Sequence, residues 1–596
     1  MTHKQFSLSD YCFAIESFPR CSYEQLRDIL VLPSTRKIQS VISSLDTESV
    51  FSKTFQKLKA PQQKNVFLLI DEVKIRPTVS FSGGVLSGMA KNEPDSRATS
   101  MLCIMVKCLH GGPSIMLSVI PVHKLTASFQ FEAVKEATAL VEKTGGIVLG
   151  SITDNHKINQ LYCKMFDKEE ESSASAKHPL DANRSWYLLF DTVHLLKCIR
   201  NNWITEKSQR LTLDNMTVGS FSDVKTLYEL EKNSILKTTR LTYASVNPSK
   251  LQLQNVQHVL RIFHEKVIAG LALQGCSATA EFIQFVLNWW NTVNVSAKGQ
   301  DIRMKDPHRA AQVLSSDSLD MYAKKFEEAM SGQGLSRKEC LTHDTKKALV
   351  QTMRGLSAVT KHLLSSGFQY VLLREIQSDR IEGEFSVYRQ STGANAFMTA
   401  GDVISACKKR LARHAASFLE SIDVTADDST STSDKHRCCG PLVAADGEAI
   451  ESSISDVTLT ANEESCCAYV AGWLERKCID DITFSDDEPF VSTEVKNFLE
   501  EVSRGSLKTP HMSTYELTRI GLSFVKKAKQ RVCCRRRLVG ILSTMGEFHD
   551  FDIVQSKKLL RHLANVLLCG LHNLEKDHQK NATLLQTSIK KARMAD

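Results

Sequence analysis

The most constraining feature of this sequence is the apolar run at residues 66–70, which is followed directly by Asp71. Such a short continuous run, rich in β-branched and aromatic residues, predicts a buried strand rather than a helix. A carboxylate at the end of a buried strand is costly to desolvate unless it is paired or binds a metal ion. Taken alone, Asp71 is explained equally well by a structural salt bridge and by a functional site.

Two further apolar runs end on an aspartate in the same way. Residues 147–153 precede Asp154, and residues 186–190 precede Asp191. Three strands that each carry an acid at or near the end predict one site where those ends converge. The repetition therefore favours a functional site over an isolated structural salt bridge.

The order of the predicted elements indicates the fold class. The patterns predict, in chain order, a strand at 65–75, a hairpin at 79–89, strands at 100–109 and 114–122, a helix at 129–143, the Asp154 strand, a helix at 156–165, a polar loop at 167–185, the Asp191 strand and another helix. A mixed sheet of about five strands with helices on its faces fits this order. We therefore expect an α/β, ribonuclease-H-like fold.

The rest of the chain is predicted to be mostly helical. Apolar stripes at helical spacing indicate an all-α insertion, in which Trp289 and Trp290 are expected in the core rather than as a base-stacking platform. The predicted organisation is a helical N-terminal region (1–60), the first part of the ribonuclease-H-like domain (61–204), the insertion (205–355), the second part of that domain (356–420), a flexible Asp/Ser/Thr-rich linker (421–463) and a helical C-terminal region (464–596).

Composition and cysteine usage are those of an ordinary soluble protein. The sequence is 42% hydrophobic and 24% charged, has no apolar run of transmembrane length, and its first residues lack a signal-peptide core. Its 17 cysteines lack the paired spacing of a strong zinc motif, so free thiols in a reducing compartment are expected. We expect a nuclear, or cytoplasmic and nuclear, protein without a membrane partner.

Positive charge is concentrated near the C-terminus. The formal net charge of +8 is modest for 596 residues and only leans towards a polyanionic partner. Lys526, Lys527, Arg535, Arg536 and Arg537 nevertheless crowd one short segment. That segment fits a solvated helix face and a DNA contact about equally well.

A fourth acid of interest is Glu382, on a helix that Ser378 or Asp379 can cap. An acid in the first turn favours the helix dipole without any catalytic role, and this stretch alone favours that ordinary interpretation. Together with Asp71 and Asp154, however, Glu382 fits a metal-binding catalytic site. Cleavage of a phosphodiester bond can use two Mg²⁺ ions held by carboxylate oxygens, and these three acids can supply them. The sequence contains no G-x-S-x-G and no P-loop that would offer a different chemistry.

Several motifs, taken together, resemble the P-element family of transposases and their THAP-domain-containing relatives. They are Leu-Leu-Ile-Asp-Glu-Val-Lys-Ile around Asp71, Thr-Asp-Asn around Asp154, the stretch 190–201 with Asp191, His194 and Lys197, the stretch 379–389 with Glu382, and Ala-Tyr-Val-Ala-Gly-Trp at 468–473. Each motif alone is a weak signal, whereas their order and spacing over residues 20–480 are specific.

The resemblance implies a ribonuclease-H-like catalytic domain interrupted by a helical insertion that, in P-element-like transposases, binds GTP. It implies Asp71, Asp154 and Glu382 as catalytic ligands of Mg²⁺ or Mn²⁺. Asp191, with His194 and Lys197, would be structural or accessory. The implied partners are DNA, GTP and further copies of the chain in a homo-oligomer.

The sequence departs from the family in three respects. The N-terminal THAP zinc finger and a clear coiled-coil dimerisation segment are not found, and Gly383 stands where the family usually has Asn after the catalytic Glu. These departures favour an alternative, a non-catalytic host-adopted DNA- or chromatin-binding protein that retains the fold. A purely structural helical scaffold is disfavoured by the acid-ended strands.

Overall fold

The structure is a computed structural model of the 596-residue chain. It describes residues 32–58, 60–82, 85–167, 175–205, 209–212, 218–313, 316–331, 341–391, 397–420, 457–478, 509–528, 538–540, 542–543 and 553–593, together with a few isolated positions. Most of the predicted linker at 421–463 and the arginines at 535–537 lie outside the described residues, so the predictions made for them stay predictions.

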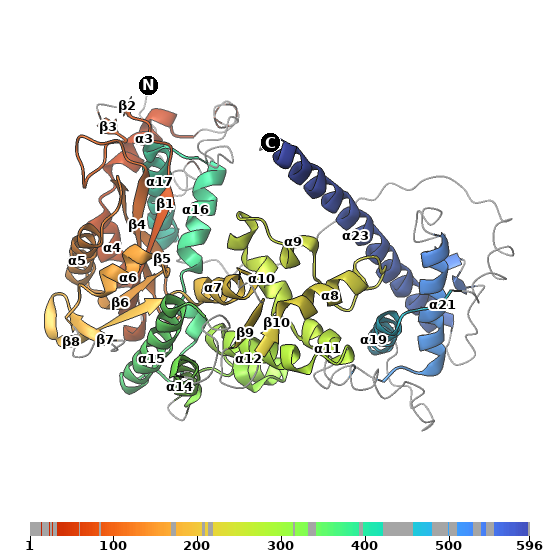
Figure 1. Cartoon of the computed structure of the whole chain (residues 1–596). Coiled ribbons are helices and arrows are strands. Elements are labelled where there is room, and N and C mark those ends of the chain that lie inside the picture. The colour runs from red at the N-terminus through yellow and green to blue at the C-terminus, as the bar shows by residue number, and fades with distance from the viewer. Residues whose placement is uncertain are drawn as a thin grey trace.

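A six-stranded mixed sheet forms the centre of the first domain, in the order β5-β4-β1-β6-β8-β7 (Figure 1). The strands are β1 (Asn65–Lys74), β4 (Ser100–Cys108), β5 (Ser114–Val122), β6 (Ile147–Thr153), β7 (Ser175–His178) and β8 (Asp181–Phe190). β1 runs antiparallel to β4 and parallel to β6, which is in turn parallel to β8. The predicted α/β, ribonuclease-H-like mixed sheet is confirmed.

The apolar run at 66–70 is buried because β1 is a central strand with a partner on each side. A parallel neighbour requires a crossover, and α5 (Ala127–Lys143) provides it between β5 and β6. The crossover helix ends at Gly145, whose φ of +100° favours glycine. Gly146 follows in close contact, since a Cβ there would lie 2.8 Å from the Phe55 ring. That ring belongs to α4 (Thr47–Lys57).

The predicted loop at 167–185 is wrong in part, because residues 175–190 form the antiparallel hairpin β7–β8. The polar residues of this segment predicted a loop, but β7 is an edge strand, where polar side chains are normal. β2 (Ser80–Ser82) and β3 (Val85–Ser87) form the predicted hairpin as a separate small sheet.

The inner half of β8 is covered on its open side by a helix instead of a strand. Beyond Tyr187 the edge strand β7 no longer pairs with β8. There α15 (His343–Ser365) approaches, and Gln351 donates to the carbonyl of Leu188 (3.2 Å). The hydroxyl of Thr352 accepts from the backbone N–H of Phe190 (3.1 Å). Side chains of α15 thus make the hydrogen bonds to the β8 backbone that a further strand would otherwise make.

Where it is described, the insertion has one strand pair, the hairpin of β9 (Arg210–Thr212) and β10 (Val218–Ser220), and is otherwise mostly helical. Its helices are α8 (Phe221–Glu231), α9 (Tyr243–Val246), α10 (Val256–Ile262), α11 (Glu265–Leu273), α12 (Ser277–Val293), α13 (Gln300–Met304) and α14 (Ser318–Ser331). Trp289 and Trp290 on α12 are both buried, so the prediction that they belong to the core is confirmed.

After α15 the chain returns to the sheet without adding a strand. Residues 368–375 form one β-bridge, Val371 with Gln312, and the 3₁₀ turn η5 (Leu373–Glu375). Two helices follow: α16 (Asp379–Ser391), which contacts β1, and α17 (Ala400–Glu420), which contacts β5. The largely apolar residues 368–375 therefore form a connection that packs in the core and does not enter the sheet.

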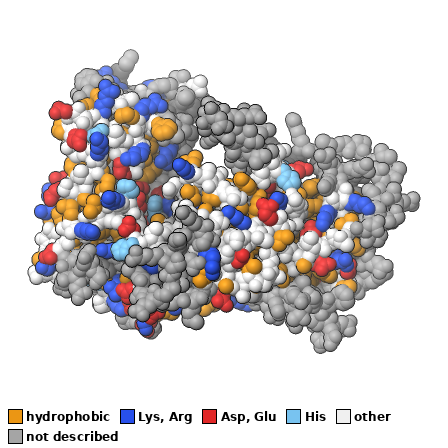
Figure 2. All heavy atoms as spheres, viewed as in Figure 1, with side chains coloured by type: hydrophobic (Ala, Val, Ile, Leu, Met, Phe, Trp, Pro, Cys, Tyr) orange, Lys and Arg blue, Asp and Glu red, His pale blue; other side chains and the backbone are white. Residues whose placement is uncertain are grey.

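The C-terminal helices form a second core at the other end of the molecule (Figure 1). They include α19 (Ala461–Cys478), α21 (Met512–Ala528) and the long α23 (Ile553–Arg593). On the face shown in Figure 2, lysine and arginine side chains are scattered and mixed with acidic ones where the residues are described. Among the described helices, none is long and apolar enough to cross a membrane.

Candidate active site

Asp71 lies on the central strand β1, opposite Cys103 of β4. Its Oδ1 accepts the backbone N–H of the next residue, Glu72 (2.7 Å). Asp154 follows the neighbouring parallel strand β6 directly. Because β1 and β6 are parallel neighbours, both aspartates lie towards the same edge of the sheet, as predicted from the acid-ended strands.

Asp154 is oriented by the turn that leads into α6 (Lys157–Cys163). Its Oδ1 accepts from the backbone N–H of His156 (2.9 Å) and from the side-chain amide of Asn159 (2.6 Å). Asn159 was not singled out from the sequence. The signal that could have found it was its position five residues after the aspartate, where the first turn of a helix brings an amide back towards the strand end.

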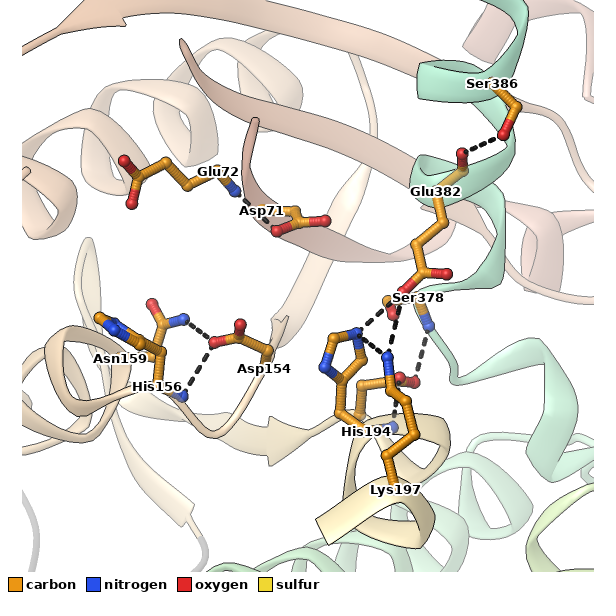
Figure 3. A network of polar contacts seen from close by, with 11 residues as sticks. Asp71, Glu72, Asp154, His156, Asn159, His194, Lys197, Ser378, Glu382 and Ser386 are labelled. Carbon is orange, nitrogen blue, oxygen red and sulfur yellow. Dashed lines mark hydrogen bonds and ion pairs between the residues drawn. The ribbon is translucent and has the colours of Figure 1, made fainter. Parts of the chain in front are cut away.

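Glu382 comes from α16, on the other side of the aspartates from α6 (Figure 3). Its Oε1 lies 2.8 Å from Nε2 of His194 and 4.0 Å from Nζ of Lys197, and both residues are on α7 (Thr192–Thr205). The hydrogen bond to His194 holds the pKa of the Glu382 carboxyl below its usual range. Burial lowers the pKa of His194, but its contacts with Glu382 and Asp191 outweigh burial and raise it.

Asp191 ties the third strand to the helix that carries Glu382. It is 1% exposed and directly follows β8. One oxygen accepts the backbone N–H of His194 in the first turn of α7, and the other accepts the N–H of Ser378, just before α16; both distances are 3.1 Å. The neighbouring Gln377 adds a bond to the hydroxyl of Thr192 (2.9 Å). Asp191 therefore positions two helices through its backbone contacts.

The charges of the other two acids act on Asp71. Burial, the charge of Asp154 and the charge of Glu382 all raise the pKa of Asp71, against the opposing contacts of Glu72 and His194, and the result is a pKa of about 7. Figure 3 shows Asp71 between Asp154 and Glu382. A buried carboxylate whose pKa is raised by neighbouring acids is arranged for a positive charge beside it.

A pair of divalent metal ions fits the chemistry of these donors, since hard cations take carboxylate oxygens. Within the described ranges, however, no group of three or more Asp, Glu, His or Cys side chains stands close enough together to hold a metal ion. Glu382 is directed to His194 and Lys197 instead. The prediction that Asp71, Asp154 and Glu382 share metal ions therefore stays a prediction, and it requires Glu382 to change its partner.

Gly383 stands where the family usually has Asn, and crowding around this position does not require a glycine. A Cβ at this position would meet no atom within 4 Å. The space around α16 would therefore accept a larger residue, such as the Asn that the family usually carries. The substitution has no packing reason in this structure.

The sequence matches a family described as TNP-like, RNase H N-terminal domain over residues 47–167. These residues hold the strands β1 to β6 and both Asp71 and Asp154. The sequence is also 20% identical over 264 residues to the transposable element P transposase of Drosophila melanogaster. The chain resembles the P-element-type transposases. That match covers 42% of this chain and 34% of the Drosophila protein, so the chain spans about a third of the curated relative.

A solved structure supports the fold of the chain. The Drosophila P element transposase strand transfer complex matches with a TM-score of 0.59 at 16% sequence identity. The match covers 69% of this chain and 93% of the solved one. The likeness therefore extends beyond the ribonuclease-H-like sheet, although at this identity it establishes the fold alone.

The basic segment of this transposase relative is only partly described. Lys526 makes an ion pair with the buried Glu463 (2.8 Å), which links α21 to the start of α19. Lys527, the next residue, is on the same helix. The predicted DNA contacts of Lys526, Lys527, Arg535, Arg536 and Arg537 stay a prediction, and Lys526 already has a structural partner.

Proposed function

We propose that this chain is a metal-dependent transposase of the P-element type, which cleaves DNA strands and transfers them. The observation that carries the proposal is that Asp71 and Asp154 lie at the same end of the parallel strands β1 and β6, and that burial, followed by the charges of Asp154 and Glu382, raises the pKa of Asp71. The two aspartates lie in the segment that matches the transposase family. The solved relative is a transposase strand transfer complex, which supports DNA as the substrate.

The residues of the site would each have a distinct task. Asp71, Asp154 and Glu382 would hold Mg²⁺ or Mn²⁺, which supplies an activated water or hydroxyl and neutralises the charge that develops on phosphoryl oxygens. Asn159 and the N–H of His156 keep the Asp154 carboxylate in one orientation. Asp191 keeps the α16 helix next to α7. His194 and Lys197 hold Glu382 in the present arrangement and would release it when a stronger positive charge is bound.

The remaining parts of the proposal rest on the resemblance. They are GTP as a ligand of the helical insertion, a homo-oligomer, and a nuclear location. One observation favours the alternative of a non-catalytic DNA- or chromatin-binding protein, namely that Glu382 is already bonded to His194 and Lys197. The two proposals differ in whether Glu382 joins the aspartates.

The test is cleavage and joining of DNA by the full chain with Mg²⁺ or Mn²⁺, comparing the wild type with Asp71→Asn. We expect the substitution to lower the cleavage rate by more than about a hundredfold, because it removes a metal ligand while keeping the side-chain shape. Calorimetric titration with Mn²⁺ should show weaker binding in the same variant.

The matched control is Asp95→Asn, which removes an exposed carboxylate from the same domain. It should leave cleavage and Mn²⁺ binding unchanged. DNA binding without any cleavage by the wild type, together with no Mn²⁺ binding, would support the non-catalytic alternative.

A further inference from the structure

A cavity of about 350 Å³ opens at the end of the sheet away from the acids. Its floor is the β4–β5 turn, where Leu109 donates its N–H to the carbonyl of Asn65 at the start of β1 (3.0 Å). The loop after α12 and the segment between α15 and α16 form the walls. A cavity of this size is in the range of small-molecule binding sites.

Three rings give the cavity its chemical character. His110, Phe368 and Tyr370 all line it. The His110 ring meets Phe368 edge-on, with centroids 5.9 Å apart, and Tyr370 at a tilt, with centroids 6.4 Å apart. His110 has a φ of 56°, in the left-handed region, which is an uncommon backbone conformation for a residue other than glycine. Rings so arranged suit a flat aromatic ligand.

The cavity is rimmed by polar groups of both signs. Ser296 lines the opening and is exposed, and the ammonium of the exposed Lys298 lies 5.2 Å from the centre of the Tyr370 ring. Glu375 also lines the cavity, but its carboxylate is paired with the buried Lys107 at 2.6 Å. Lys298 does not line the cavity itself, but its contact with Tyr370 places a positive charge beside the aromatic lining.

We propose that this cavity binds a planar aromatic ring that carries an anionic group. The ring would lie among His110, Phe368 and Tyr370, the Ser296 hydroxyl would bond to a polar edge, and the anion would lie at Lys298. A mononucleotide and an aromatic carboxylate share this chemistry. The site is separate from the acids and does not depend on the proposed transposase activity.

The cavity lies at the beginning of the segment that leads to Glu382. Ile376 lines it, and Gln377 next to it donates to the hydroxyl of Thr192 and the carbonyl of Val293, both at 2.9 Å. Ser378 then bonds to Asp191. A ligand that fills the cavity would restrain residues 368–376, so slower hydrogen exchange there reports where it binds.

The experiment is calorimetric titration of the full chain with adenosine 5′-monophosphate and with indole-3-acetate, which distinguishes the two ligand sources. Adenosine and inorganic phosphate, tested separately, represent the two halves of the nucleotide. We expect at least one charged aromatic probe to bind, and each half to bind about tenfold more weakly or less. Hydrogen exchange should slow at 109–111 and 368–376 on binding.

Three surface variants test the location without removing a core side chain. Ser296→Trp should block the opening and abolish binding, Tyr370→Leu should weaken it, and Lys298→Ala should weaken binding of the charged probe by about three- to tenfold while sparing adenosine. Lys250→Ala, at another exposed lysine of the insertion, is the matched control. No binding by either charged probe, or binding that Ser296→Trp and Tyr370→Leu leave unchanged, would overturn the proposal.

Discussion

Asp71 is the residue at which function and stability oppose each other. Burial and the nearby Asp154 raise its pKa from 3.8 to about 7, so the folded protein holds a proton there that the unfolded chain releases near pH 4. Between these two values the folded state binds more protons, and stability falls as the pH rises. Without metal, the ionised Asp71 therefore destabilises the fold at neutral pH and above.

We predict that Asp71→Asn is more stable than the wild type at pH 8 in the absence of divalent metal. The gain in unfolding free energy should be about 1 to 3 kcal/mol, since one pKa unit corresponds to about 1.4 kcal/mol and solvent screens part of it. Chemical denaturation measures the difference, with Asp95→Asn as the control. Equal or lower stability of Asp71→Asn would show that the ionised, buried Asp71 carboxylate does not destabilise the fold.

His414 on α17 gives a pH dependence of the opposite sign. Burial and the nearby Arg410 lower its pKa from 6.5 to about 4, and its Nε2 lies 3.4 Å from the hydroxyl of Thr54. Between pH 6.5 and about 4 the unfolded chain binds a proton that the folded protein does not. Stability from this group is therefore present above pH 6.5 and is lost as the pH falls towards 4.

Between pH 7 and pH 4.5, His414→Gln should lose about 1 to 2 kcal/mol less unfolding free energy than the wild type loses. Thermal unfolding at both pH values measures the effect. His343→Gln, which changes a histidine with a side chain 76% exposed, should leave the loss unchanged. The interpretation fails if both variants lose stability with pH in parallel with the wild type.

At the scale of elements, the sheet is completed by a helix. Thr352 and Gln351 of α15 satisfy the backbone of β8 at Phe190 and Leu188, one and three residues before Asp191. Buried backbone groups left without a partner cost about 1 to 3 kcal/mol each. α15 therefore stabilises the strand end that carries Asp191, and through Asp191 the beginning of α16.

Thr352→Val should lower the unfolding free energy by about 1 to 2 kcal/mol, because it keeps the side-chain shape but leaves the Phe190 N–H unpaired. Thr360→Val is a matched control on the same helix, since the buried hydroxyl of Thr360 has no hydrogen-bond partner. Chemical denaturation of both variants gives the comparison. Similar losses in the two would mean that the bond to Phe190 contributes nothing.

At the scale of the whole molecule, the C-terminal helices are joined to the insertion by side chains of both parts. Ile235 and Leu236 of the insertion belong to the C-terminal core. Lys237 pairs with Asp577 of α23 (3.1 Å), and Lys266 of α11 lies 4.4 Å from the centre of the Tyr469 ring. Gly570 of α23 allows the closest approach, because a Cβ there would lie 2.6 Å from the carbonyl oxygen of Ile235.

We predict that Gly570→Ala weakens this association although alanine favours a helix. The contact of the new methyl with a backbone oxygen should cost about 1 to 3 kcal/mol, whereas the change of residue in an isolated helix would stabilise it. After proteolytic cleavage within 421–456, the C-terminal fragment should co-elute with the remainder in the wild type and separate more readily in the variant.

Gly540→Ala is the control, because a Cβ at that position meets no atom within 4 Å. It should leave co-elution unchanged. If the wild-type fragments separate completely after cleavage, the contacts of Ile235 and Lys266 do not hold the two parts together.

The sequence by itself determined the features that depend on neighbours along the chain. The apolar run before Asp71 predicts a buried strand because burial follows from composition, and the same reasoning places Asp154 and Asp191 directly after β6 and β8. The crossover helix and its end at Gly145 were predicted for the same reason, since periodicity and a positive φ are local. The α/β class followed from the order of these elements.

Only the tertiary structure decided how distant segments meet. Glu382 and His194 are 188 positions apart, and no local pattern shows that they share a hydrogen bond. The polar strand β7 was misassigned as a loop because partners far along the chain determine whether a segment joins a sheet. The roles of Asn159 and Thr352 depend on the particular oxygen or N–H that packing places beside them.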